Sequence, residues 1–161
     1  MTLKTQERRV ELNQLVVQLS EKIRTEATVW RIIAVIQVVI GLLTIVFNLF
    51  AGSLGEVLYG SLIILIAVRN YKLSADDLKF VQIISVNPIG IVSKYESIIP
   101  LIINLAYNIF VGGVIGAVAC VFGFMTRSFV VKNKEGFLAL ENGVNGTNNP
   151  FNATQYNFNN Q

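Results

Sequence analysis

Glu56 is the side chain of this 161-residue sequence with the clearest potential for chemistry inside an apolar segment. No other Asp, Glu, Lys or Arg occurs between Arg31 and Arg69. A carboxyl group inside hydrocarbon is costly and usually functional, so Glu56 could carry a proton or bind a cation. In the competing interpretation it lies at the aqueous interface near a helix start, beside Ser53 and Gly55. Glu56 is therefore a candidate ion or proton site, with a helix-cap role as the alternative.

Asparagine and glycine residues in the apolar segments are candidates for holding helices together. An amide side chain in a membrane helix usually forms hydrogen bonds to a neighbouring helix, and each bond contributes about 1 kcal/mol. Glycines spaced four residues apart let two helices approach closely. We therefore predict helix-packing roles for Asn48, Asn108, Gly112, Gly113 and Gly116.

The residue types needed for most catalytic and metal sites are missing. The sequence has no His and one Cys, which excludes His-based metal sites, four-cysteine zinc sites, Ser-His-Asp triads and intrachain disulfides. Asp76 and Asp77 are the only Asp residues, and their context is typical of a helix start. Cys120 has apolar neighbours, which makes its thiol unreactive. We predict that the chain is not an enzyme and binds no metal or cofactor.

The composition places these residues in a membrane. Hydrophobic residues make up 53% of the chain and charged residues 14%, whereas a soluble domain carries about 25% charged residues. The segment 30–50 is long enough to cross a hydrocarbon layer roughly 30 Å thick. A second apolar run, 54–68, follows after residues 51–53. So short a connection joins antiparallel neighbours, and the sequence therefore predicts a helical hairpin.

The last apolar stretch, residues 98–125, is long for one membrane crossing and short for two. Its centre, residues 107–112, resembles residues 47–52 at the first predicted turn. Lys and Arg favour the cytoplasmic side, and they flank the apolar segments but are missing from both turns. A second hairpin, shallow or re-entrant, puts every basic cluster on one side, whereas a single crossing leaves the basic residues of the tail outside. We predict four embedded helices, with three spans as the alternative.

The predicted fold is an all-α integral membrane protein with two consecutive helical hairpins after an amphipathic N-terminal helix. A largely disordered, Asn-rich cytoplasmic tail ends the chain. The predicted boundaries are 1–28 for the cytoplasmic amphipathic helix, 29–131 for the membrane domain (helices 29–50, 54–72, 97–111 and 114–131, cytoplasmic connector 73–96) and 132–161 for the tail.

The N-terminal segment 6–28 has the pattern of an amphipathic helix. Its apolar residues share one stripe at helical spacing, and two oppositely charged pairs are expected on the outer face. No Pro or Gly precedes Gly41, so the helix is expected to continue into the first membrane segment. It is interpreted as a self-association or partner-docking helix, with a solvated extension as the alternative. The stripe consists of Leu12, Leu15, Leu19 and Ile23, and the outer pairs are Glu21–Arg24 and Lys22–Glu26.

The connector 73–96 contains two expected helix boundaries. Residues 74–77, a Ser followed by Ala and two Asp, are typical of a helix N-terminus. The helix that follows is expected to end before Asn87, because the residue before Pro88 avoids the helical region. Asn87 would then cap a further helix with Pro88 at its first position. Near the C-terminus, a helix is expected to end at Gly143.

Three segments in the second half of the chain carry a resemblance to other proteins. Residues 87–96, 110–116 and 127–135 read NPIGIVSKYE, FVGGVIG and RSFVVKNKE. They resemble a group of small, uncharacterised membrane proteins of Gram-positive bacteria. The resemblance implies a bacterial plasma membrane and carries over no functional residues.

Three functions fit these features. The first is an accessory or interaction subunit of the plasma membrane that packs by helix–helix contacts, as a homo-oligomer or in a larger membrane complex. The second is a holin-like oligomeric pore, although the first span has only Gln37, Thr44 and Asn48 scattered along it. The third is a small transporter that uses Glu56. In each case the chain lies in the lipid bilayer with both termini cytoplasmic, and its basic residues are too dispersed for nucleic acid.

Overall fold

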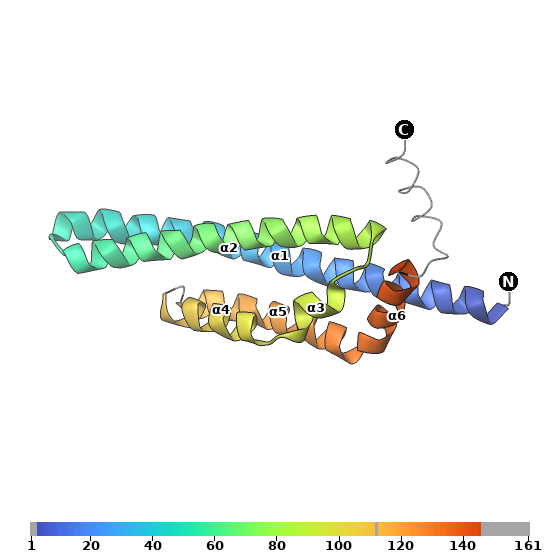
Figure 1. Cartoon of the computed structure of the whole chain (residues 1–161). Coiled ribbons are helices and arrows are strands. Elements are labelled where there is room, and N and C mark those ends of the chain that lie inside the picture. Colours follow the sequence, from blue (N-terminus) through green and yellow to red (C-terminus); the bar gives the residue numbers. More distant parts are fainter. Residues whose placement is uncertain (1–2, 112, 146–161) are drawn as a thin grey trace, which may run out of the picture.

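The computed structural model describes residues 3–111 and 113–145, with side chains over 10–111 and 113–143. This part of the chain is α-helical and contains no strand, which confirms the predicted all-α class (Figure 1). Three helices are long and apolar enough to cross a membrane: α1 over Val10–Ala51, α2 and α5. The helices are α1 (Leu3–Ala51), α2 (Leu54–Val86), α3 (Ile91–Glu96), α4 (Ile99–Phe110), α5 (Gly113–Lys132) and α6 (Lys134–Asn145).

Helices α1 and α2 lie antiparallel and side by side along most of their length (Figure 1). Gly52 makes the turn between them with a φ of 71°, a conformation that glycine adopts without strain. The Ser53 N–H donates to the Asn48 carbonyl at 3.0 Å and closes the end of α1. As the lack of breakers before Gly41 indicates, α1 runs unbroken from its N-terminal segment into the apolar one.

Helix α2 does not break at Lys72, so the expected helix start at Ser74 is wrong. Ser74 is fully buried inside the helix, and its hydroxyl donates to the Tyr71 carbonyl at 2.7 Å. The first part of the predicted connector is thus a continuation of α2. No Pro or Gly lies between Gly60 and Asn87, so nothing in the backbone ends the helix earlier. Its end at Val86, before Asn87, is where the Asn-Pro pair predicts it.

A short helix, α3, follows the Asn-Pro pair but starts later than expected. Asn87 forms the C-cap of α2 in an extended conformation and does not cap a new helix. Gly90, with a φ of 82°, is the N-cap of α3, and its carbonyl accepts from the Lys94 N–H at 3.1 Å. The local reason is that only glycine turns into the left-handed region here without strain.

Helices α4 and α5 form a second antiparallel pair, which packs through α5 against α1. Gly113 begins α5 with a φ of 67°, and the Val111 N–H donates to the Tyr107 carbonyl at 3.0 Å. The turn of this pair stops well short of the α1–α2 turn (Figure 1). Helix α6 then folds back against α1, and it continues through Gly143, where it was expected to end, to Asn145.

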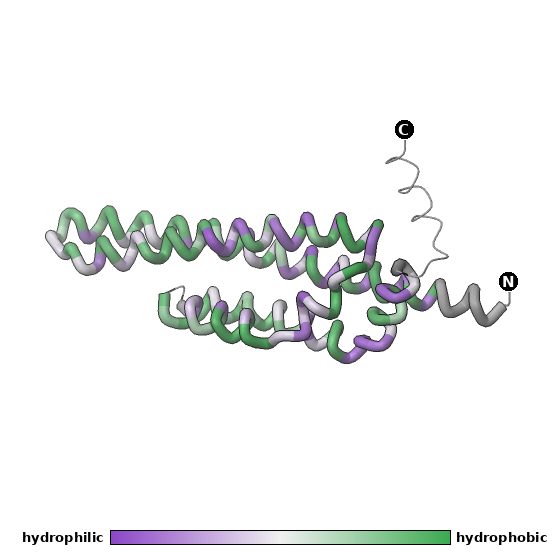
Figure 2. The backbone as a smooth tube through the Cα atoms, in the orientation of Figure 1, coloured by the Kyte–Doolittle hydropathy of each residue, from purple (hydrophilic) through white to green (hydrophobic). Residues whose placement is uncertain are grey.

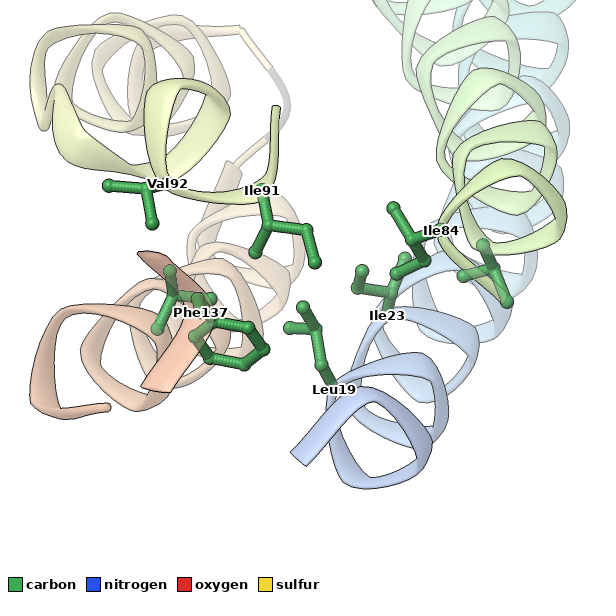
Figure 3. Packing of buried hydrophobic residues seen from close by; sticks show 8 residues of the cluster. Leu19, Ile23, Ile84, Ile91, Val92 and Phe137 are labelled. Carbon is green, nitrogen blue, oxygen red and sulfur yellow. The ribbon is translucent and has the colours of Figure 1, made fainter. Parts of the chain in front are cut away.

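One end of the molecule, called the head below, has an apolar core (Figure 3). Five helices contribute to it, and its side chains point towards one another. Burial of such side chains from water is the main favourable term in folding. The cluster consists of Leu19, Ile23, Val81, Ile84, Ile91, Val92, Val130 and Phe137.

Away from the head, large apolar side chains face outwards on α1, α2, α4 and α5. Figure 2 shows hydrophobic residues predominating along the two helix pairs and hydrophilic ones gathering towards the head. The outermost positions are the most exposed, with Phe50 at 89% and Val114 at 81%. An apolar surface this extensive marks a membrane or protein contact. Together with the long apolar helices, it identifies the chain as a membrane protein.

Candidate functional site

The predicted ion or proton residue, Glu56, lies exposed on the first turn of α2. Near it, Gly52 and Gly55 leave open space around their backbones. The buried polar side chains of the described residues, such as Asn70 and Asn108, lie further from the α1–α2 turn, towards the head. The structure therefore places Glu56 apart from the buried polar side chains.

Three amide side chains meet in the interior, away from the head. Asn70 of α2 donates through Nδ2 to Gln37 Oε1 of α1 at 3.3 Å and to Asn108 Oδ1 of α4 at 3.0 Å. All three residues are at most 1% exposed. Asn108 also donates to the Asn104 carbonyl one turn earlier at 2.8 Å. This amide cluster (Gln37, Asn70 and Asn108) ties together the two helix pairs.

Asn108 also faces Gly116, so two of the predicted packing residues meet. A Cβ atom added to Gly116 would lie 2.5 Å from Asn108 Oδ1, which only glycine avoids. Gly113 sits at the turn in a left-handed conformation, and Gly112 lies outside the described residues. Asn48 is different, because its amide donates to the Thr44 carbonyl in its own helix at 2.8 Å.

Gly41 and Gly60 form a close crossing of α1 and α2 that the sequence interpretation missed. An added Cβ would lie 2.8 Å from the Gly60 carbonyl oxygen in one case and 2.9 Å from the Gly41 carbonyl oxygen in the other. The two backbones therefore touch, as in close packing of membrane helices. The signal was present, since both glycines lie inside apolar helices where glycine otherwise lowers helix stability.

A pocket of about 220 Å³ lies between the two helix pairs, where the apolar region meets the head. Helices α2 and α4 wall it, and α1, α3 and α5 supply the remaining sides. Its lining mixes charged and amide groups with aromatic and aliphatic ones. The lining residues are Glu26, Trp30, Arg69, Asn70, Leu73, Asp77, Lys94, Tyr95, Ser97, Pro100, Leu101, Asn104 and Arg127.

Glu26 is a buried carboxyl group in this pocket and is only 8% exposed. It precedes the apolar part of α1, which begins at Trp30. Burial raises the pKa of Glu26 to about 7, and hydrogen bonding with Thr126 opposes this rise. A Cβ on Gly123 would lie 3.0 Å from a Glu26 oxygen, so the glycine makes room for the carboxyl group. The expected exposed pair of Glu26 with Lys22 is therefore wrong; the Lys22 ammonium instead lies over the Phe129 ring, 5.2 Å from its centroid.

Two arginines and one ion pair supply the charge of the pocket. Arg69 donates through Nη1 to Asn104 Oδ1 at 2.9 Å, and its guanidinium lies over the Tyr107 ring. Arg127 donates through Nη2 to the Glu96 carbonyl at 2.9 Å, while its buried Nε has no hydrogen-bond partner among the described residues. Lys94 Nζ lies 2.8 Å from Asp77 Oδ1, so these two charges compensate each other. Within the part of the chain that the structure describes, Asn70 Oδ1 also has no hydrogen-bond partner.

The helical stripe of the N-terminal segment could have revealed Glu26. Glu26 follows Ile23 by three residues and precedes Trp30 by four, so it lies on the face that carries Leu19. Between Leu19 and Trp30 the residues on this face are buried, and Glu26 is buried with them. The convergence of Arg69, Arg127 and Asn70 had no comparable signal, because α2, α4 and α5 meet only through the tertiary fold.

The pocket brings charged and amide side chains together with apolar walls. Within the described ranges no three His, Cys, Asp or Glu side chains are grouped as metal ligands. Cys120 is buried beside Ala119 and Trp30. Comparisons of the chain with protein-family models, curated proteins and solved structures find no match. The resemblance to small membrane proteins of Gram-positive bacteria therefore stays a prediction.

Proposed function

We propose that the chain is an accessory or interaction subunit of a cell membrane, embedded by two helical hairpins with both termini cytoplasmic. The distribution of basic residues supports this orientation. In α1 and α2 no Lys or Arg lies between Arg31 and Arg69, whereas Lys94, Arg127 and Lys132 lie towards the head. Positive residues favour the cytoplasmic side, so the head is assigned to the cytoplasm.

The two helix pairs reach different depths in this proposal. The apolar part of α1, residues 30–50, rises about 30 Å, which matches one hydrocarbon layer. Helix α4 has 12 residues and rises only about 18 Å. Asn108, two residues from the end of α4, contacts Asn70, which lies about 24 Å along α2 from the first turn. The α1–α2 pair is thus the transmembrane hairpin and the α4–α5 pair a re-entrant one.

A re-entrant turn needs its backbone groups satisfied inside the membrane. The Tyr59 hydroxyl of α2 reaches the Val111 carbonyl at 3.5 Å, and the Val111 N–H is bonded within α4. The α1–α2 pair therefore supports the turn of the shorter pair. This contact supports the half-depth arrangement over a single long crossing of residues 98–125.

The amide cluster is the observation that carries the functional proposal. Its side chains are hydrogen-bonded to one another inside the bundle, while the outer faces of the same helices are apolar. A pore or transport path needs polar groups facing a route through the membrane. The arrangement instead favours a rigid embedded unit that offers apolar faces to other helices and a folded head to the cytoplasm.

Crosslinking in the membrane tests the interaction role. A photoreactive residue at Leu65 or Val118, both outward-facing, should capture the same protein partner or a second copy reproducibly. The matched control is the neighbouring Ala67 or Ala119, which is buried. Capture of lipid alone from every outward position, with a monomer in mild detergent, would refute the proposal. Ion leakage from cells on expression would favour the pore instead.

Cysteine labelling tests the embedding. In a Cys120→Ala background, an impermeant reagent on intact cells should label Ser53→Cys and fail to label Ser97→Cys until the membrane is opened. Val114→Cys, at the tip of the shorter pair, should resist labelling from both sides. Labelling of Val114→Cys from outside would make the α4–α5 pair a full crossing. Labelling of Thr154→Cys from outside would overturn the cytoplasmic tail.

A further inference from the structure

We propose that the pocket between α2 and α4 holds the phosphate-bearing headgroup of a membrane phospholipid, with the acyl chains lying along the apolar faces beyond it. This inference rests on the proposed embedding in a membrane. The lining combines cationic donors, amide and carboxyl acceptors and apolar walls, and such a mixture can contact both the polar and the apolar parts of a lipid headgroup region.

The unused donors of the pocket suit a phosphate group. A guanidinium group has five N–H donors, and the structure shows one hydrogen bond for Arg69 and one for Arg127. The Nε of Arg127 is buried, and no described group forms a hydrogen bond with it. Arginine binds phosphate oxygens with two parallel hydrogen bonds, so an anion between the two side chains would satisfy these donors.

The net charge of the pocket also favours an anion. Lys94 and Asp77 form an ion pair at 2.8 Å and largely cancel each other. The raised pKa of Glu26 lowers its negative charge near neutral pH. With two further arginines in the lining, the pocket keeps a net positive charge, and basic pockets between membrane helices on the cytoplasmic side are typical headgroup sites.

One unused acceptor, Asn70 Oδ1, indicates what else the headgroup should carry. Asn70 is 1% exposed and lines the pocket, and its Oδ1 has no hydrogen-bond partner in the described chain. The Glu26 carboxyl group lies in the same pocket. A buried acceptor without a donor is costly, so the ligand should bring N–H or O–H groups. A phosphodiester that carries a hydroxyl or an ammonium group meets both requirements.

The position of the pocket points to a lipid as the source of the phosphate. Leu73, Pro100 and Leu101 supply apolar walls, which a free phosphate ion does not need. Towards the membrane, helical spacing from Arg69 and Leu73 continues the same face of α2 with Ile66 and Leu62. Acyl chains can follow this apolar face while the headgroup stays between the arginines.

Thermal unfolding of the full chain, purified in mild detergent and washed free of phospholipid, tests the proposal. Phosphatidylglycerol in mixed micelles should raise the Tm in a dose-dependent way. Diacylglycerol, which lacks the phosphate, and inorganic phosphate at the same concentration should leave the Tm unchanged. An equal rise with inorganic phosphate would show an ion site and overturn the lipid assignment.

Charge variants with matched controls show whether the pocket is responsible. Arg69→Gln and Arg127→Gln should each weaken the phosphatidylglycerol effect about ten-fold or more. Lys72→Gln and Lys132→Gln remove an exposed charge from the same helices outside the pocket and should respond like the wild type. Equal weakening in all four variants would mean non-specific surface binding and refute the proposal.

A second type of variant covers the case in which an arginine variant fails to fold. Leu73→Trp fills the pocket and keeps every charge, and it should abolish the phosphatidylglycerol effect. A Leu73→Trp variant that responds like the wild type would overturn the site. Carbonate extraction of membranes distinguishes a failure of the proposed embedding from a failure of the lipid site. Release of the chain by carbonate would contradict the embedding. A chain that resists extraction but shows no lipid response would contradict only this inference.

Discussion

The two ends of the molecule bury opposite kinds of side chain. In the head, Leu19 and Phe137 lie fully buried, and charged groups such as Lys79 and Asp76 face outwards. Away from the head, Asn70 and Asn108 are buried, and apolar side chains such as Leu49 face outwards. The head buries apolar side chains, as a protein does in water. The other end buries polar side chains and exposes apolar ones, as a protein does in lipid.

The switch from buried to exposed apolar side chains occurs within single continuous helices. It therefore reflects the surroundings of each segment and not a change of secondary structure. Helix α1 carries Leu19 at 0% exposure on one side of Trp30 and Leu49 at 60% on the other. Burial of apolar area stabilises the head against water, by about 25 cal/mol per Å². Lipid removes that driving force, so close backbone contact and interhelical hydrogen bonds hold the other end. Substitutions at the two ends should therefore differ in cost.

The largest effect is expected in the head, from Phe137→Ala. Loss of this fully buried ring should lower the free energy of unfolding by about 3–5 kcal/mol. Denaturant unfolding in mild detergent, followed by fluorescence of the single Trp, measures it. The neighbouring Leu138, 37% exposed, provides the control: Leu138→Ala should cost less than half as much. Equal costs would contradict a water-type core in the head.

The next largest effect is a pH dependence of stability caused by Glu26, which lies between the head and the apolar end. Burial raises the pKa of Glu26 from 4.5 to about 7, so the folded state binds its proton more tightly than the unfolded state. Stability should therefore fall as the pH rises from about 4.5 to 7, by up to about 3 kcal/mol, and then level off. Glu26→Gln should flatten this dependence and stabilise the protein at pH 8. Tm measurements across this range check both points, and an unchanged pH profile would contradict the burial of Glu26.

An intermediate loss of stability is expected where the backbones of α1 and α2 touch in the apolar region. Gly60→Ala places a Cβ against the Gly41 carbonyl oxygen and should cost about 1–3 kcal/mol. Gly55→Ala meets nothing within 4 Å and should be neutral or slightly stabilising. Unfolding in mild detergent compares the two. If both variants behave alike, close packing does not hold the α1–α2 pair.

The smallest effect belongs to the amide cluster. Asn108→Ala removes the acceptor of Asn70 and should cost about 1 kcal/mol, the usual size of an interhelical hydrogen bond in membranes. Asn48→Ala removes a bond within one helix and should cost less. A double-mutant cycle of Asn108 with Asn70 isolates the pair. A coupling energy near zero would show that the cluster does not join the helix pairs.

Local chemistry alone was enough to predict the helical class, the apolar segments, the continuity of α1 and the end of α2 at the Asn-Pro pair. Each depends on composition or on a few adjacent residues, such as the absence of Pro and Gly before Gly41. Local signals failed where a side chain had an alternative partner. Ser74 resembles a helix cap, but its hydroxyl bonds back to Tyr71 inside an unbroken helix.

Only the tertiary structure decided which polar groups meet. Asn70 and Asn108 are 38 residues apart, and no sequence spacing relates them. Nor does the sequence place Arg69 and Arg127 around one pocket with Glu26, because that requires α2 and α5 to be positioned against α1. The physical reason is that the preference of a side chain for water or lipid is a property of that residue alone. Which side chains contact one another depends on how whole helices pack.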